Sequence, residues 1–335
     1  MARTNLVLPM NALIRAALAA ALAAGLCAIA SAQTAPDCPP TAQAPSPERL
    51  QAGLRDARDH GFLWRISKDG RSSWLFGTLH VAKLEWDFPG PAQREALAAS
   101  DTLALELDLL DPLIQQRMAK ALAAQPKAAL PAALQTRIAS RVQAECLPPQ
   151  ALDALAPELQ VAVLTSMLGR RDGLDVAWGI DGFLAGWGRQ AKMEMVSLET
   201  PELQLKMLLM PNPAETVEMV GSMLDEIDSG RALATLRRLA AIWADGDLAE
   251  LQRYETWCEC IKTAADRALM VRMLDDRNPA LADAIAELHA VGQRVFAAVG
   301  SLHMIGPTGL PALMAQRGYR VERIAYKQKP QETRP

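Results

Sequence analysis

The chain has 335 residues, of which 50% are hydrophobic and 22% are charged, and its formal net charge is −3 at pH 7. This balance is that of an ordinary globular protein and excludes the collagen-like, coiled-coil and disordered classes. The sequence has no strong basic cluster, which argues against nucleic acid as a partner.

The N-terminal segment has the three parts of a secretory signal peptide. Arg3 and Arg15 supply positive charge, residues 16–30 are almost wholly apolar, and Ala30-Ser31-Ala32 is a small-x-small cleavage site. The apolar run is shorter than the roughly 20 residues that span a bilayer, so an uncleaved anchor is the weaker alternative. We expect a signal peptide over residues 1–32, no membrane span in the mature chain, and a periplasmic or secreted location.

Four cysteines remain after the expected cleavage: Cys38, Cys146, Cys258 and Cys260. An even number in an exported chain favours disulfide bonds. We expect Cys258 and Cys260 not to pair with each other, because Cα atoms two positions apart on a helix or a strand do not suit the bridge. A cysteine-based metal site is the weaker alternative, since one Cys-x-Cys without a second pair is a weak zinc signal.

Strands are predicted at both ends of the mature chain. Residues 33–60, which open on a Pro-, Ala-, Thr- and Ser-rich stretch, are expected to form a flexible leader, with order beginning near Phe62. A β-hairpin follows, because apolar runs at 62–66 and 73–76 flank the turn dipeptide Asp69-Gly70.

Further strands are predicted at 102–107, 193–198, 295–299 and 319–325, and most of the chain from 111 to 275 has the composition of helices interrupted by proline. No internal segment has the composition of a linker. The predicted fold is therefore one α/β domain over 61–327, with a mixed central sheet from strands at both ends of the chain, a large helical insertion, and a short tail over 328–335.

One motif occurs twice. Residues 74–80 and 297–303 each consist of an apolar strand followed by Gly, a small hydroxyl residue, Leu and His, and they end in His80 and His303. Glycine permits a sharp turn or a close backbone approach. The histidine then projects from the end of a strand, where the active sites of α/β folds gather. A single Gly-x-x-His is weak evidence, but the matched pair with matched strands indicates function.

Carboxylates are expected beside these two imidazoles. Glu106 follows a buried strand, where an isolated charge is costly unless it is paired, hydrogen-bonded or metal-bound. Glu199 ends another predicted strand, and Asp108 would face the same side as Glu106. The alternative for each is a helix cap or a surface salt bridge. Neutral histidine with carboxylate suits a divalent metal that keeps an open water position, or, without metal, a histidine base oriented by the glutamate.

Other polar residues have weaker patterns. Arg277 would bind a substrate carboxylate or stabilise an oxyanion, or else pair with a neighbouring acid such as Asp275. Asp181 opens a helix and is expected to act as a cap or dipole partner. His60 and His289 lack the motif and are expected at the surface. Dinucleotide, nucleotide, zincin and serine-hydrolase motifs are absent from the sequence, which argues against those classes.

The sequence resembles the TraB/GumN/PrgY family, which includes the animal Tiki proteases. The resemblance covers about 62–325 and rests on the two Gly-x-x-His motifs, Leu105-Glu106-Leu107-Asp108, Gly179-Ile180-Asp181, Leu198-Glu199-Thr200 and Arg277-Asn278. It implies a fold related to the erythromycin esterase and ChaN-like group and, in the Tiki branch, a metal-dependent peptidase that favours manganese or cobalt. By this resemblance, His80, Glu106 and His303 would be catalytic and hold the metal, with Glu199 and Arg277 or Asn278 in support.

Three functional hypotheses follow. The first is an exported metal-dependent hydrolase, expected to be a peptidase, that acts on a peptide or small exported substrate. The second is a metal-free, esterase-like hydrolase in which His80 is the base and Glu106 its partner, acting on an ester or similar electrophile. The third is a non-catalytic periplasmic protein that binds a peptide or an exported polymer. All three require His80 and His303 to meet beside Glu106.

Overall fold

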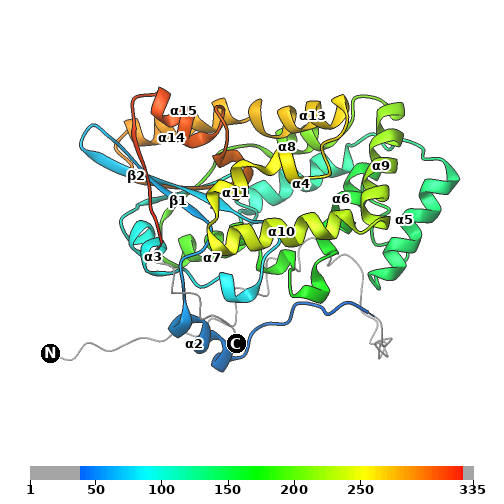
Figure 1. The fold of residues 1–335 in the computed structure, drawn as a ribbon, viewed down its shortest axis with the longest axis horizontal. Coiled ribbons are helices and arrows are strands. Elements are labelled where there is room, and N and C mark those ends of the chain that lie inside the picture. Colours follow the sequence, from blue (N-terminus) through cyan, green and yellow to red (C-terminus); the bar gives the residue numbers. More distant parts are fainter. Residues whose placement is uncertain (1–37, 327–335) are drawn as a thin grey trace.

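The structure is a computed structural model that describes residues 38–326. One mixed sheet has the strand order β4-β3-β5-β2-β1-β6. It lies at one end of the molecule, at the left of Figure 1, and most of the helices lie at the other. The strands are β1 (Phe62–Lys68), β2 (Arg71–Thr78), β3 (Thr102–Leu105), β4 (Glu194–Ser197), β5 (Val295–Gly300) and β6 (Arg320–Arg323). The predicted α/β fold, with strands from both ends of the chain and a large helical insertion, is confirmed.

The strand pairings bring the two ends of the chain together. The hairpin of β1 and β2 turns at Asp69 and Gly70, whose φ angles are 51° and 74°, the left-handed conformation that suits a tight hairpin. Strand β2 then pairs in parallel with β5, and β3 pairs in parallel with both β5 and β4. The carboxyl ends of β2, β5, β3 and β4 therefore meet at one edge of the sheet.

The core lies on both faces of this sheet. Every residue from Val295 to Val299 in β5 is 0% exposed, as expected for a central parallel strand covered on both sides. Helices α14 (Asn278–Ala290) and α15 (Leu310–Gln316) lie above the sheet in Figure 1, and α3 (Pro91–Ala98) and α7 (Ile180–Gln190) lie below it. Each fully buried aliphatic or aromatic side chain contributes about 1.5–3 kcal/mol to stability.

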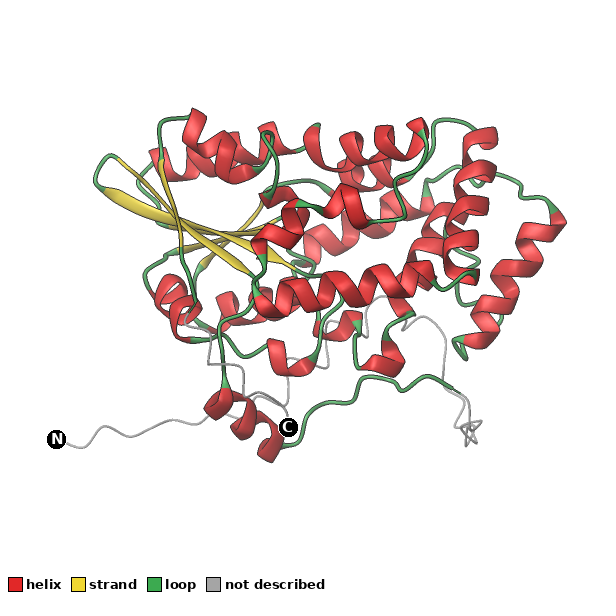
Figure 2. Ribbon diagram, viewed as in Figure 1, coloured by secondary structure: helices red, strands yellow, loops and turns green. Residues whose placement is uncertain are grey.

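The remaining helices form the insertion, with a second apolar cluster that includes Val161, Leu164, Val220 and Leu224 (Figure 2). The longer helices are α4 (Pro112–Ala123), α5 (Ala132–Ala144), α6 (Pro157–Met167), α8 (Pro201–Leu208), α9 (Pro213–Asp228), α10 (Arg231–Asp245) and α13 (Ala264–Met270). Shorter turns are η1 (Leu84–Trp86), η2 (Arg170–Asp172), η3 (Val176–Trp178), α11 (Leu248–Gln252), α12 (Tyr254–Trp257), the π-helical η4 (Val271–Asp275) and η5 (Ser301–Met304). None of the helices within residues 38–326 is both long and apolar enough to cross a bilayer.

Part of the predicted leader is ordered, which corrects the expectation that order begins near Phe62. Helix α2 (Pro47–Asp56) lies inside it and begins at Ser46, whose side chain accepts a hydrogen bond from the backbone N–H of Arg49. Proline at the first helical position and serine at the cap favour this start. The predicted signal peptide over 1–32 and the tail over 328–335 lie outside the described residues.

The four cysteines form two disulfides. Cys38 pairs with Cys146, with a Cα–Cα distance of 5.7 Å, and Cys258 pairs with Cys260 at 5.1 Å. The expectation that Cys258 and Cys260 would not pair was wrong. It assumed a helix or a strand, whereas Cys258 caps the end of α12 in extended backbone and the chain then turns, so the two Cα atoms are within bridging distance.

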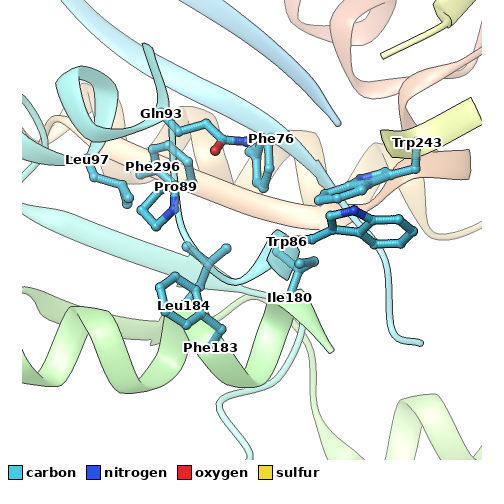
Figure 3. Close-up of a pocket in the computed structure, with 10 residues that line it drawn as sticks. All are labelled: Phe76, Trp86, Pro89, Gln93, Leu97, Ile180, Phe183, Leu184, Trp243 and Phe296. Atoms are coloured by element: carbon cyan, nitrogen blue, oxygen red, sulfur yellow. The ribbon is translucent and has the colours of Figure 1, made fainter. Parts of the chain in front are cut away.

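An apolar pocket lies between the sheet and the two helices α3 and α7 (Figure 3). Its walls include Phe76, Trp86, Trp243 and Phe296, and Gln93 is its one polar side chain. None of the side chains that line it is titratable or nucleophilic. We therefore interpret this pocket as a feature of core packing and not as a catalytic site. One of its walls also contacts the first Gly-x-x-His motif, because the Trp243 indole N–H donates a 2.8 Å hydrogen bond to the carbonyl oxygen of Gly77.

Candidate active site

The two Gly-x-x-His motifs meet at the carboxyl edge of the sheet. Thr78 and Gly300 are register partners in the pairing of β2 with β5. A Cβ added to Gly300 would lie 3.2 Å from Glu106 Oε1, 3.6 Å from His80 Nε2 and 3.6 Å from His303 Cδ2. Side chains that follow three different strands therefore border one point above Gly300, as the sequence predicts.

The glycines of the two motifs are needed for close approach. A Cβ on Gly77 would lie 2.9 Å from the Ser301 hydroxyl oxygen, and that hydroxyl donates a 2.7 Å hydrogen bond to the carbonyl oxygen of Thr78. The φ angle of Gly300 is −48°, which any residue can adopt. Glycine at position 300 therefore provides space beside the imidazoles and Glu106, and no special backbone conformation.

His80 is oriented by Asp181, from the first turn of α7. Its Nδ1 lies 2.7 Å from Asp181 Oδ2, and the Thr78 hydroxyl donates to Asp181 Oδ1 at 2.7 Å. An ionised carboxylate can only accept, so Nδ1 carries the proton. Within the described residues Nε2 makes no hydrogen bond to protein, and the His80 side chain is 65% exposed. Asp181, expected to be a cap or dipole partner, is thus the residue that fixes the His80 tautomer.

The charge of Asp181 also sets the acidity of His80. Its electrostatic attraction raises the pKa of His80 to about 9, with a smaller contribution from Glu106. At neutral pH most of the imidazole is protonated, and the free Nε2 lone pair becomes available as the pH rises toward that value.

Arg277 is the central cation of a cluster that also contains Glu106, Glu199 and His303, called the Arg277 cluster below. Each of the five N–H donors of Arg277 has an acceptor. Nε and Nη2 donate to the two oxygens of Glu199 at 2.8 and 2.5 Å, and Nη2 also donates to Glu106 Oε2 at 2.5 Å. Nη1 donates to the carbonyl oxygen of Met273 and to His303 Nε2, both at 3.0 Å. Arg277 therefore has no donor left for a substrate carboxylate, and its role is to hold four partners in place.

His303 faces this arginine rather than solvent. Its Nδ1 lies 2.6 Å from the side-chain oxygen of Asn278 and must donate to it, so Nε2 is the acceptor for Arg277. Burial lowers the pKa of His303 to about 4, despite the opposing effect of Glu106. The ring is therefore neutral at pH 7, and it positions Arg277.

Glu106 is a buried anion. Its Oε1 accepts a 2.7 Å hydrogen bond from the backbone N–H of Gly300, and Gln204 donates to Oε2 at 3.3 Å. Burial alone would raise its pKa, but the neighbouring His80, His303 and Arg277 side chains lower the pKa of Glu106 to about 2. Such a carboxylate stays ionised at neutral pH, where it is a weak base and a strong electrostatic partner.

A divalent ion held jointly by His80, Glu106 and His303 does not fit this arrangement. His303 Nε2 and Glu106 Oε2 both face Arg277, which occupies the place of a cation between the carboxylates. Among residues 38–326, no three His, Cys, Asp or Glu side chains are arranged to hold a metal ion. Manganese or cobalt binding thus stays a prediction of the family resemblance, and we derive no chemical step from it.

Asp108 has the alternative role given for it, that of an ion pair: it is buried, and Arg189 donates to it at 2.5 Å. Two other expectations are corrected by the structure. His289 is 1% exposed and hydrogen-bonded to Ser73, and His60 is part-buried, bonded to the carbonyl oxygen of Ala244. Neither histidine is a surface residue. Each is hydrogen-bonded to a residue far away in the chain, which the local sequence does not reveal.

The residues and their order can be compared with known proteins. A family model described as the TraB/PrgY/gumN family matches residues 62–323. The chain belongs to this family. The match spans all six strands and every residue of the Arg277 cluster, which confirms the resemblance seen in the sequence. No curated protein and no solved structure matches the chain.

Proposed function

We propose that this TraB/PrgY/gumN family member is an exported hydrolase that cleaves peptides, with His80 as its general base. The observation that carries the proposal is the contact between His80 Nδ1 and Asp181 Oδ2, which leaves Nε2 unpaired and exposed at the carboxyl edge of the sheet, beside Glu106. A histidine whose other nitrogen is held by a carboxylate is a recurring arrangement for proton transfer.

The space above Gly300 is the place for the attacking water, because Glu106 Oε1 and His80 Nε2 both border it. His80 Nε2 takes one proton from the water as its oxygen forms a bond to the substrate carbonyl carbon. The resulting imidazolium is stabilised by Asp181 and by the Glu106 carboxylate. It then gives the proton to the leaving nitrogen as the C–N bond breaks, which returns His80 to its neutral form.

The other residues act by positioning. Arg277 neutralises Glu106 and Glu199 and fixes the Glu106 carboxylate beside the backbone N–H of Gly300. Without this cation the two buried carboxylates would repel each other. Preorganised charges in a buried cluster cost no rearrangement during the reaction.

Export is supported by two features. The sequence has the charged start, apolar run and small-x-small site of a signal peptide. The Cys38–Cys146 disulfide joins the start of the described chain to the helical insertion, and such structural bridges persist in oxidising compartments such as the periplasm. We therefore propose a periplasmic or secreted location.

The test is peptide cleavage by the purified mature protein, with elemental analysis of the same sample. The proposal predicts turnover that survives a chelator. Turnover that a chelator abolishes and manganese or cobalt restores would replace it with the metal-dependent hydrolase. Tight peptide binding without cleavage, with or without added metal, would replace it with the non-catalytic binding protein.

A further inference from the structure

Arg272 is a part-buried cation without a charged partner in the described part of the chain. Its Nε is buried and has no hydrogen-bond acceptor. Its Nη2 lies 3.6 Å from the sulfur of Met210, which is a weak acceptor. A buried guanidinium N–H without an acceptor is costly to keep. This contrasts with Arg277, whose five donors are all filled.

Arg272 belongs to a segment that borders the active site. It lies in the π-helical turn η4, about one turn before Arg277, and the carbonyl oxygen of Met273 in the same turn accepts from Arg277 Nη1. Turns of this kind are rare and occur frequently at functional sites. Another residue of η4, Asp275, accepts a 2.6 Å hydrogen bond from Thr308, which follows the His303 motif.

The residue that the Arg272 side chain contacts, Met210, also belongs to a segment that borders the active site. Met210 lies two residues beyond the end of α8, the helix whose Gln204 donates to both Glu106 and Glu199. The turn η4 follows α13 directly in the chain and contacts α8. The unfilled guanidinium donors therefore lie between the two segments that hold Arg277 and Gln204.

We propose that Arg272 binds a carboxylate of the substrate, so that this hydrolase prefers peptides with a carboxylate close to the scissile bond. The inference rests on the proposed function and names its substrate class. A guanidinium matches a carboxylate through two parallel N–H···O bonds. Arg277 cannot take this role because its donors are filled, and Arg272 is the neighbouring cation that has donors free.

The carboxylate has two possible sources, an acidic side chain or the free C-terminus of the peptide. Matched peptides separate them: one pair differs in Glu against Gln near the scissile bond, and the other in a free against an amidated C-terminus. The proteins compared are wild type, Arg272→Gln, Arg272→Lys and the control Arg267→Gln. Arg267 is exposed on α13, in the same part of the chain.

The expected result is that wild type prefers the carboxylate member of one pair by about tenfold or more in kcat/KM, the range of a charge-assisted hydrogen bond. Arg272→Gln should lose this preference through a higher KM with little change in kcat, and Arg272→Lys should keep part of it. Arg267→Gln should behave as wild type. Thermal melts identify a variant that has not folded.

A binding measurement separates this inference from the proposed function. Calorimetry with His80→Ala, which would bind without turnover, should show the same preference for the carboxylate peptide, and the double variant with Arg272→Gln should lose it. Equal binding of both members of each pair, or no binding of either, would overturn the Arg272 proposal whether or not the wild-type protein is a hydrolase. A preference that survives Arg272→Gln would overturn it as well.

Discussion

His80 Nδ1 lies 2.7 Å from Asp181 Oδ2, and this contact joins the end of β2 to the start of α7. It determines which nitrogen of His80 faces solvent and how readily that nitrogen gives up its proton. Because both properties come from one carboxylate, a change at Asp181 should alter both the pH dependence of the reaction and its maximal rate.

Asp181→Asn should move the pH profile of kcat/KM. Asp181 raises the pKa of His80 to about 9, and the base must be neutral, so wild-type activity should rise with pH through that value. With the charge removed, the rise should shift toward the ordinary histidine pKa of about 6.5, while the plateau rate falls because the tautomer is no longer fixed. Asp153→Asn, on the exposed surface, is the control. A profile that declines from neutral pH toward 9 would contradict the base role.

Gly300→Ala should lower activity without unfolding the protein. The new methyl group would lie 3.2 Å from Glu106 Oε1 and 3.6 Å from His80 Nε2, in the space assigned to the attacking water. Displacement of reacting groups by about 1 Å costs about a hundredfold in rate. Gly186→Ala, on α7 with no atom within 4 Å of the added Cβ, should leave activity unchanged. Comparable kcat/KM values for the two variants would show that the water does not occupy this space.

Arg277→Met should destabilise the protein strongly. The substitution leaves Glu106 and Glu199, both 7% exposed, without their cation. Loss of one partner from a buried ionic cluster costs about 3–5 kcal/mol. Arg117→Ala, whose partner Glu202 is exposed, should have a much smaller effect, because exposed ion pairs contribute little to stability. Denaturant unfolding measures both, and equal free energies of unfolding for the two variants would mean that the cluster does not stabilise the fold.

The two disulfides should differ in their effect on stability. Cys38 and Cys146 are 108 positions apart, whereas Cys258 and Cys260 are two apart. In the chain-entropy model a bridge over a loop of that larger size stabilises by about 4–5 kcal/mol, and the contribution falls as the loop shortens. Unfolding of the Cys38→Ser/Cys146→Ser and Cys258→Ser/Cys260→Ser proteins tests this. A larger loss of stability in the second protein would refute the ordering.

The sequence predicts where the strand-end residues lie, because the pattern of buried strands agrees with the pattern of polar residues that directly follow those strands. Parallel neighbouring strands expose their carboxyl ends at one edge, and the motifs of His80 and His303, together with Glu106 and Glu199, all follow such strands. Arg277 has a weaker pattern that leaves several roles open, and the structure places it at the centre of these residues.

The partners of these residues were not predictable from local patterns. Asp181 has the position of an ordinary helix-start acid, and its contact with His80 depends on how α7 packs against β3 and β4. The five acceptors of Arg277 come from four separate segments of the chain. The Cys258–Cys260 pairing depends on a turn that the residue types do not specify. The first two are tertiary relationships and the third is a local turn, and residue spacing alone encodes neither.

The most direct test of the central claim is the rate of peptide hydrolysis by His80→Ala relative to wild type and to Lys120→Ala, an exposed control on α4. A general base contributes about 10²–10⁴-fold to a rate. We predict a loss of that size in kcat/KM for His80→Ala, none for Lys120→Ala, and unchanged melting temperatures. Hydrolysis by His80→Ala at the wild-type rate would contradict the account.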